Sequence, residues 1–169
     1  MKKFIFLVAV ILVSVITAMA QPRAIGARLG YNTEVSYQHS MSKKTYAQLD
    51  AGLYRFGRGA QVVGTYNFIF ATPNWTPYGT WEWFAGGGVG VGVDWRTYWR
   101  WTNHYTYVRY PALFLGVAGN VGLAFNFEFP LQVAVDFRPM IGPEFLYGSI
   151  RFHREGLFAP AISARYRFK

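Results

Sequence analysis

The stretch WEWFAGGGVGVGVDW, residues 81–95, alternates between two kinds of side chain. Its odd positions carry tryptophan, alanine, glycine and valine, whereas its even positions carry four glycines, one phenylalanine and two carboxylates. Side chains in a β-strand point alternately to opposite faces, so this stretch predicts a strand with one apolar face and one small or polar face. Glycines 86, 88, 90 and 92 on the second face leave room for a neighbour's bulky side chain or for a small cavity.

The same period of two runs through most of the chain on either side of this stretch. It covers residues 24–38, 47–53, 61–70, 113–127, 131–138 and 157–168, with a weaker run near 144–153. Turn residues such as Gly57-Arg58-Gly59 and Pro77-Tyr78-Gly79 separate the runs. The pattern predicts an all-β fold of about eight antiparallel strands, closed as an up-and-down barrel, in a single domain spanning residues 21–169.

The volumes of the two faces decide which of them points inward. An eight-stranded barrel has an interior just wide enough for side chains, so the face rich in Gly, Ala, Ser and Asn suits the inside. The face carrying Trp, Tyr, Phe and Leu then points outward, which favours lipid as the surroundings. The alternative is a water-soluble barrel of the lipocalin kind, with an apolar inside and a charged outside. The composition argues against it, because 33 of 169 residues are aromatic and only 15% are charged.

The first twenty residues have the pattern of a cleaved secretory signal peptide. Lys2 and Lys3 precede an apolar run over residues 4–16, and Ala18-Met19-Ala20 places small residues where a signal peptidase reads them. A membrane-anchor helix is the alternative, but the run is shorter than the roughly 20 apolar residues such a helix needs. We therefore expect cleavage near Ala20, export, and a mature chain that begins at Gln21.

These features together resemble those of a known group of proteins. The segment AIGARLGY at residues 24–31, the glycine-rich strand at residues 81–95 and the closing Arg165-Tyr166-Arg167-Phe168 are similar to segments of small outer-membrane β-barrel proteins, of the opacity-protein and OmpA transmembrane-domain type. The resemblance implies the outer membrane of a Gram-negative bacterium, with outer-membrane lipid and the barrel-assembly machinery as partners. Tyr166 and Phe168 match the terminal aromatic signal that this machinery reads, although Lys169 follows the final Phe. The resemblance does not imply one activity.

Nine charged residues fall on the inward face of the predicted strands. They are Arg28, Glu34, Asp50, Glu82, Asp94, Asp136, Arg138, Arg165 and Arg167. Charges removed from water must pair, so we expect a salt-bridge and hydrogen-bond network that plugs the barrel. The alternative is a narrow channel that conducts protons or ions.

No arrangement of catalytic or metal-binding residues is recognisable. The three histidines, His39, His104 and His153, lie in or near connections, and His39-Ser40 is the one pair with the elements of a nucleophile and base. The tetrapeptide Ser40-Met41-Ser42-Lys43 matches a Ser-x-x-Lys pattern but lacks the companion motifs of the enzymes that use it. We expect no enzyme, no metal and no cofactor, with a lipid-modifying barrel enzyme as the alternative. The formal net charge is +9, but the arginines are scattered singly, which argues against nucleic acid.

Residues 96–110 form an aromatic and cationic hairpin that is the best candidate for binding a ligand. Its candidate residues are Tyr98, Trp99, Arg100, Trp101, Tyr105, Tyr107 and Arg109. Tyr, Trp and Arg dominate binding hot spots, so we expect a surface ligand, a carbohydrate or an anionic lipid headgroup, and an adhesion or structural role. The alternative is that these rings anchor the barrel at the membrane interface. Eight strands counted from Ala24 place this hairpin on the side of the termini, unless the count is wrong by one across residues 139–155.

Overall fold

The computed structural model describes residues 22–100, 106–146, 149–153 and 156–168. The predicted signal peptide at residues 1–20 lies outside these ranges. The strands are β1 (Pro22–Gly30), β2 (Thr33–Ser40), β3 (Thr45–Tyr54), β4 (Gly59–Ala71), β5 (Gly79–Arg100), β6 (Thr106–Phe127), β7 (Leu131–Phe137), β8 (Met140–Leu146), β9 (Ser149–His153) and β10 (Pro160–Arg167). Within the described ranges, no helix is long and apolar enough to span a membrane.

The strands form a closed antiparallel barrel with eight positions around its wall. Their order is β5-β4-β3-β2-β1-β10-β7-β6, and pairing of β5 with β6 closes the circle. The two remaining strands lengthen existing positions, because β8 follows β7 along the same partner β6, and β9 pairs with β8 as β10 pairs with β7. The predicted fold, a closed up-and-down barrel of eight strands, is confirmed, with β8 and β9 as additions.

The strand boundaries differ from the prediction in two places. Residues 24–38, predicted as one strand, form the β1–β2 hairpin with Tyr31 and Asn32 between the strands. A two-residue turn leaves the inside and outside parity unchanged, so the alternation runs through it without a break. The weak strand predicted near residues 144–153 is wrong as well, because this segment forms the β8–β9 hairpin. The first error omits one strand of the wall and the second adds one, so the predicted number of eight is still correct.

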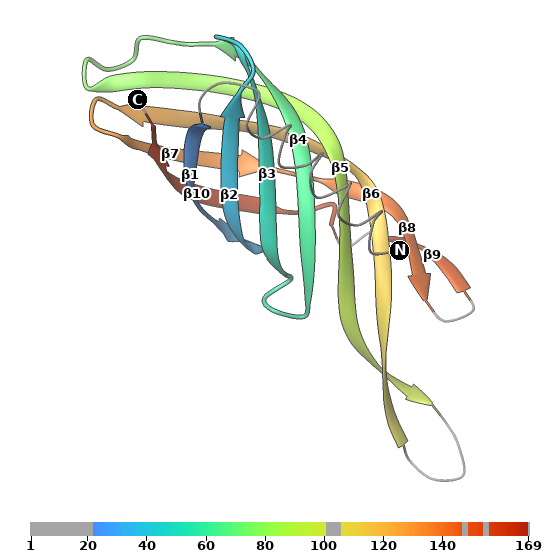
Figure 1. Cartoon of the computed structure of the whole chain (residues 1–169). Coiled ribbons are helices and arrows are strands. Elements are labelled where there is room, and N and C mark those ends of the chain that lie inside the picture. The colour runs from blue at the N-terminus through green and yellow to red at the C-terminus, as the bar shows by residue number, and fades with distance from the viewer. Residues whose placement is uncertain (1–21, 101–105, 147–148, 154–155, 169) are drawn as a thin grey trace, which may run out of the picture.

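The corrected boundaries settle where the long hairpin lies relative to the termini. The end of the barrel that holds Pro22 and Phe168 also holds residues 41–44, 72–78 and 128–130, and we call it the terminal end. The opposite end, here the hairpin end, holds the turns at 31–32 and 55–58 and the projecting parts of β5–β6 and β8–β9 (Figure 1). Because β1 and β2 are two strands, and β8 and β9 add no position to the wall, residues 96–100 and 106–110 lie toward the end opposite the termini. The miscount expected across residues 139–155 is therefore accompanied by a missed turn at residues 31–32, and the sidedness problem raised by the sequence disappears.

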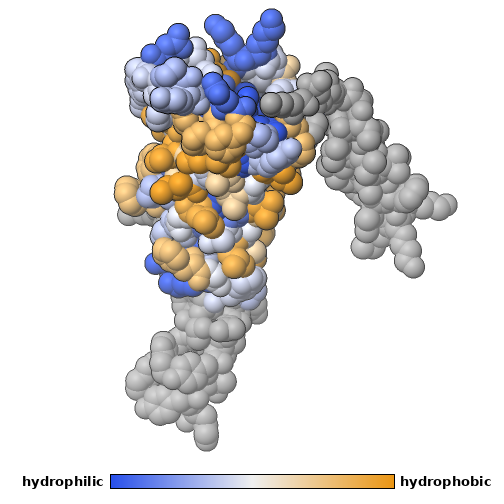
Figure 2. All heavy atoms as spheres, turned by 90° about the vertical axis from the view of Figure 1, so that its left-hand side faces the viewer, coloured by the Kyte–Doolittle hydropathy of each residue, from blue (hydrophilic) through white to orange (hydrophobic). Residues whose placement is uncertain are grey.

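The alternation places mostly apolar side chains outside and mostly polar or small ones inside, apart from rings and aliphatic groups buried toward each end of the interior. On β2 the inward Glu34, Ser36 and Gln38 are buried, whereas the outward Val35 is 61% exposed. Figure 2 shows hydrophobic residues gathered in a band across the middle of one face, with hydrophilic residues at its upper edge. This distribution of side chains is the reverse of that in a water-soluble protein, which buries its apolar side chains and exposes its polar ones.

Two inward glycines of β5 make room for bulky neighbours. A Cβ added at Gly92 would lie 2.3 Å from Cζ of Phe114, and one at Gly90 would lie 2.6 Å from Sδ of Met140. The sequence left open whether these glycines make room for a bulky neighbour or for a small cavity. At Gly90 and Gly92 they make room for neighbours, because large side chains from β6 and β8 fill the space.

Candidate functional site: a charged cluster inside the barrel

The interior gathers most of the charged residues expected there, from strands distant in the sequence. Arg28, Asp50, Asp94, Arg165, Arg138, Glu34 and Asp136 are all buried, each with at most 3% of its surface exposed. Glu82 and Arg167 are partly exposed near the terminal end. The period of two is the reason, because it turns alternate residues of each strand toward one shared interior.

Glu34 is the centre of this cluster. Its Oε2 accepts from Nη1 of Arg28 at 2.9 Å, and both of its oxygens accept from Nη2 of Arg138 at 2.6 Å. Gln61 adds a hydrogen bond from Nε2 to Oε1 at 2.6 Å. One carboxylate therefore joins two guanidinium groups that come from β1 and from the β7–β8 connection.

Each of these two arginines also binds an aspartate of its own. Arg28 donates from Nε and Nη2 to Oδ1 of Asp136 at 2.8 and 2.6 Å, while Ser163 donates to Oδ2 at 3.1 Å. Arg138 forms an ion pair with Asp50 through Nη1, and Gln48 donates to Oδ2 of Asp50 at 2.8 Å. The cluster therefore contains two guanidinium groups and three carboxylates. Charge-assisted and bidentate contacts of this kind are the strongest hydrogen bonds that side chains form.

Arg165 lies in the same interior but contacts neutral groups. Its Nε donates to Oγ of Ser36 at 2.9 Å and its Nη1 to Oε1 of Gln132 at 3.3 Å. Its Nη2 has no hydrogen-bond partner among the described residues. Arg165 therefore adds a third positive charge to the interior without binding a carboxylate directly.

A separate ion pair lies nearer the terminal end. Arg23 pairs with Glu82, and its guanidinium lies 4.8 Å from the centre of the Tyr46 ring. Arg167 donates to the carbonyl of Phe127 at 3.4 Å. The sequence did not predict the role of Arg23, because its odd position belongs to the outward face. A register shift between Pro22 and Ala24 breaks the alternation there, as a β-bulge does.

Apolar clusters accompany the charged cluster toward both ends of the interior. Tyr46 packs with Ile69 and Phe84 in one cluster, and Tyr54 packs with Phe114 and Met140 in the other. Tyr46 lies near the start of β3 and Tyr54 at its end, and the buried Gln48 and Asp50 lie between them on the same inward face. Along β3, the polar layer therefore lies between two layers of rings.

The described residues form no catalytic arrangement around the histidines that the sequence singles out. Nδ1 of His39 lies 3.1 Å from the hydroxyl of Tyr37, and no hydrogen bond joins it to Ser40. His104 and the side chain of His153 lie outside the described part of the chain. Within that part, no group of three His, Asp or Glu residues is placed to hold a metal ion.

The candidate binding hairpin is described by its backbone alone. The β5–β6 ladder continues from the pair Trp95 and Pro111 to the pair Arg100 and Thr106. Trp101 and Tyr105 lie outside the described residues, as do the side chains of Tyr98, Trp99, Arg100, Tyr107 and Arg109. The ladder shows that this hairpin extends the two longest strands of the barrel at the hairpin end.

The outer surface carries a belt of rings in tilted and edge-to-face contact at the terminal end. Ring centres are 5.4 Å apart for Trp75 and Trp81, 4.7 Å for Trp81 and Phe125, 4.6 Å for Phe125 and Phe127, and 4.8 Å for Phe127 and Phe129. Tyr166 and Phe168, the predicted assembly signal, are both exposed, with ring centres 5.4 Å apart. Trp75 and Phe129 were not predicted to join this belt, because they lie in connections where no periodicity assigns a face.

No protein-family model, curated protein or solved structure matches this chain.

Proposed function

We propose that this protein is an integral outer-membrane β-barrel of the small opacity-protein and OmpA transmembrane-domain kind, with a plugged lumen. The observation that carries the proposal is the inside-out arrangement of the wall. Buried ion pairs between Arg28, Glu34 and Arg138 fill the interior, while Val35, Val89 and Ile162 are each at least 60% exposed outside. Such a surface is unfavourable in water and favourable against lipid chains.

The dimensions of the apolar band support this environment. Trp83 and Trp95 lie at its two limits on β5, and the outward residues between them are aliphatic or glycine. Twelve residues of strand tilted by roughly 40° rise about 30 Å along the barrel axis. A membrane barrel needs an apolar band about 25 Å tall, flanked by aromatic residues at both interfaces.

The first test is the cellular location of the protein. We expect it to fractionate with outer membranes and to migrate on gels at a different apparent mass before and after heating, since small barrels stay folded in detergent until heated. The measurement is immunodetection after membrane fractionation, with heated and unheated samples side by side. Recovery as a soluble periplasmic protein would contradict the proposal.

The plugged interior favours a structural or surface-binding role over a channel. The cluster around Glu34 occupies the interior between the layers of rings at Tyr46 and Tyr54. Planar-bilayer recording distinguishes the two roles. The proposal predicts no stable open state, whereas a steady nanosiemens conductance would favour the channel.

A surface-binding role would reside in the β5–β6 hairpin. Residues 96–100 and 106–110 follow the outward Trp95 and extend the ladder past the apolar band at the end opposite the termini. In an outer-membrane barrel the termini lie on the periplasmic side and the longer loops outside the cell. The hairpin would then present aromatic and arginine residues, the types typical of binding hot spots, to the outside.

Shortening the hairpin tests this role. Replacing residues 97–108 with an Asn-Gly turn, which suits a two-residue hairpin, is expected to leave insertion intact and to abolish adhesion to host or carbohydrate surfaces. Heat-modifiable migration reports insertion, and a cell-adhesion or glycan-array assay reports binding. If the shortened barrel fails to insert, the hairpin rings are membrane anchors and the binding role is wrong.

A further inference from the structure

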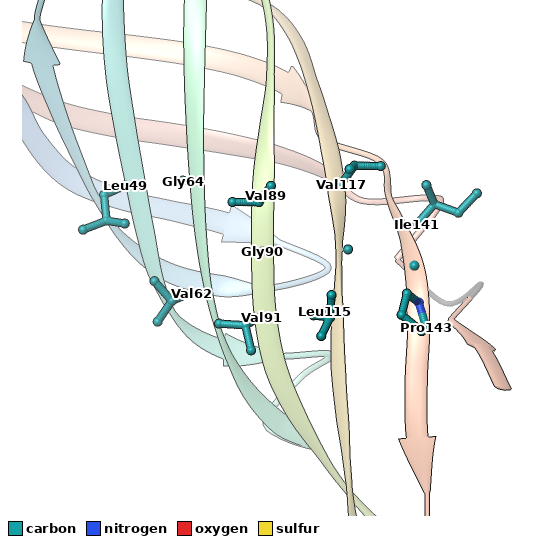
Figure 3. A pocket seen from close by; sticks show the side chains of 12 residues that line it. Leu49, Val62, Gly64, Val89, Gly90, Val91, Leu115, Val117, Ile141 and Pro143 are labelled. Carbon is teal, nitrogen blue, oxygen red and sulfur yellow. The ribbon is translucent and has the colours of Figure 1, made fainter. Parts of the chain in front are cut away.

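The outer wall of the barrel has a hollow where β3, β4, β5, β6 and β8 lie side by side (Figure 3). Its first row of outward residues consists of the register partners Leu49, Gly64, Val89, Val117 and Ile141. Gly64 forms an open floor, because a Cβ added there would meet no atom within 4 Å. The volume of the hollow, about 730 Å³, lies within the range of roughly 300–1,000 Å³ of small-molecule sites.

A second hollow continues from the first toward the hairpin end. Its volume is about 530 Å³, and Leu53, Ala60 and Val93 are among its lining residues. Val62 and Val91 line both hollows. Together the hollows form an apolar groove that approaches the β3–β4 turn.

The β3–β4 turn places arginine at the end of this groove. The exposed Arg58 is two residues from Ala60, and its carbonyl oxygen accepts a hydrogen bond from the backbone N–H of Trp95 at 2.8 Å. Arg55 and Phe56 adopt left-handed φ angles of 47° and 53°, which are costly for residues with a side chain. Oδ1 of Asn32 accepts from the backbone N–H of Arg55 at 2.9 Å, so the neighbouring β1–β2 turn helps to hold this conformation.

The charges near the groove favour an anion. At the hairpin end Arg58 and Arg151 are exposed, and every carboxylate of the described residues at that end is buried. The two acidic side chains of the described chain that are not buried, Glu82 and Glu128, lie toward the terminal end. A negatively charged group that approaches Arg58 therefore meets no exposed carboxylate of the described residues.

Building on the proposed membrane location, we propose that this groove binds an anionic lipid that carries a phosphate group. The acyl chains occupy the two hollows and the phosphate lies at Arg58, with Arg55 in the same turn. Guanidinium groups suit phosphate because their N–H donors match the phosphate oxygens. The groove presents glycine and short aliphatic side chains, so an acyl chain can lie close to the strands and bury apolar surface.

The test compares two lipids that share acyl chains and differ in headgroup charge. The purified protein in mixed micelles is offered dimyristoyl phosphatidylglycerol or dimyristoyl phosphatidylcholine, and retained lipid is counted by native mass spectrometry. We expect preferential retention of phosphatidylglycerol. Arg58→Gln should lower that preference about fivefold, the effect of one basic residue near an anionic membrane surface. Gly64→Leu should lower the retention of both lipids, because it fills the hollow.

Two matched variants control for charge and bulk elsewhere on the barrel. Lys44→Gln removes a positive charge at the terminal end, and Ala27→Leu adds an outward leucine on β1, away from the groove; both should retain lipid as the unmodified protein does. Equal retention of the two lipids by the unmodified protein would overturn the proposal, as would Ala27→Leu acting like Gly64→Leu. Heat-modifiable migration is measured for every variant, so that a loss of lipid retention is distinguished from a failure to fold and insert. Failure of the unmodified protein to insert would overturn the membrane proposal itself.

Discussion

Replacing Arg138 with Met is expected to lower the free energy of unfolding by about 3–5 kcal/mol, the cost of breaking a buried ion pair by removing one partner. Arg138 binds both Glu34 and Asp50. Without it, Asp50 keeps Gln48 as its one hydrogen-bond partner among the described residues, and Glu34 keeps Arg28 and Gln61. A buried carboxylate without a cation is the main penalty.

Glu34→Gln is the matched variant, and its effect should be smaller. It removes the carboxylate at the centre of the cluster, but Arg28 keeps Asp136 and Arg138 keeps Asp50. The direct cluster then holds two guanidinium groups and two carboxylates, an even balance. Urea unfolding of the barrel in lipid vesicles, followed by tryptophan fluorescence, measures both variants. A larger loss for Glu34→Gln than for Arg138→Met would contradict this description of the cluster.

Introducing arginine at Val89 should destabilise the inserted barrel by about 2–4 kcal/mol, the cost measured for a positive charge at the lipid-facing midplane. Val89 is 66% exposed and lies midway between Trp83 and Trp95 on the outward face of β5. Val89→Leu is the control and should have little effect, because leucine remains apolar. The same vesicle unfolding measurement applies. If Val89→Arg is as stable as Val89→Leu, the wall does not face lipid at this position.

Much of this architecture follows from the period of two. The alternation in residues 81–95 and 113–127 is enough to predict Asp94 inside and Val89 outside, because each strand must present one face to the interior. The same rule selects Arg28, Glu34 and Arg138 as inward residues. Their specific partners do not follow from it, since contacts between β1, β2 and the β7–β8 connection depend on the register of the whole barrel.

The failures of the prediction have equally specific causes. A turn with an even number of residues leaves the alternation unchanged and so cannot be detected from it. The pattern therefore assigns Tyr31 and Asn32 to one strand, although they form the turn between β1 and β2. The alternation is also interrupted by the bulge between Pro22 and Ala24, so it does not predict that Arg23 pairs with Glu82. It assigns no face to loop residues such as Trp75. The apolar groove was not predicted, because it arises from outward residues such as Gly64 and Val89 on different strands.

Because the chain contains no cysteine, a single introduced cysteine can carry a fluorescent label that reports whether the wall faces lipid. A bimane label on Val89→Cys, in the protein reconstituted into vesicles, should be quenched by lipids brominated along their acyl chains and not by iodide in the aqueous phase. We expect this result because Val89 faces outward at the middle of the apolar band. Quenching by iodide with no effect of brominated lipid would show that the wall faces water, and would contradict the proposed membrane barrel.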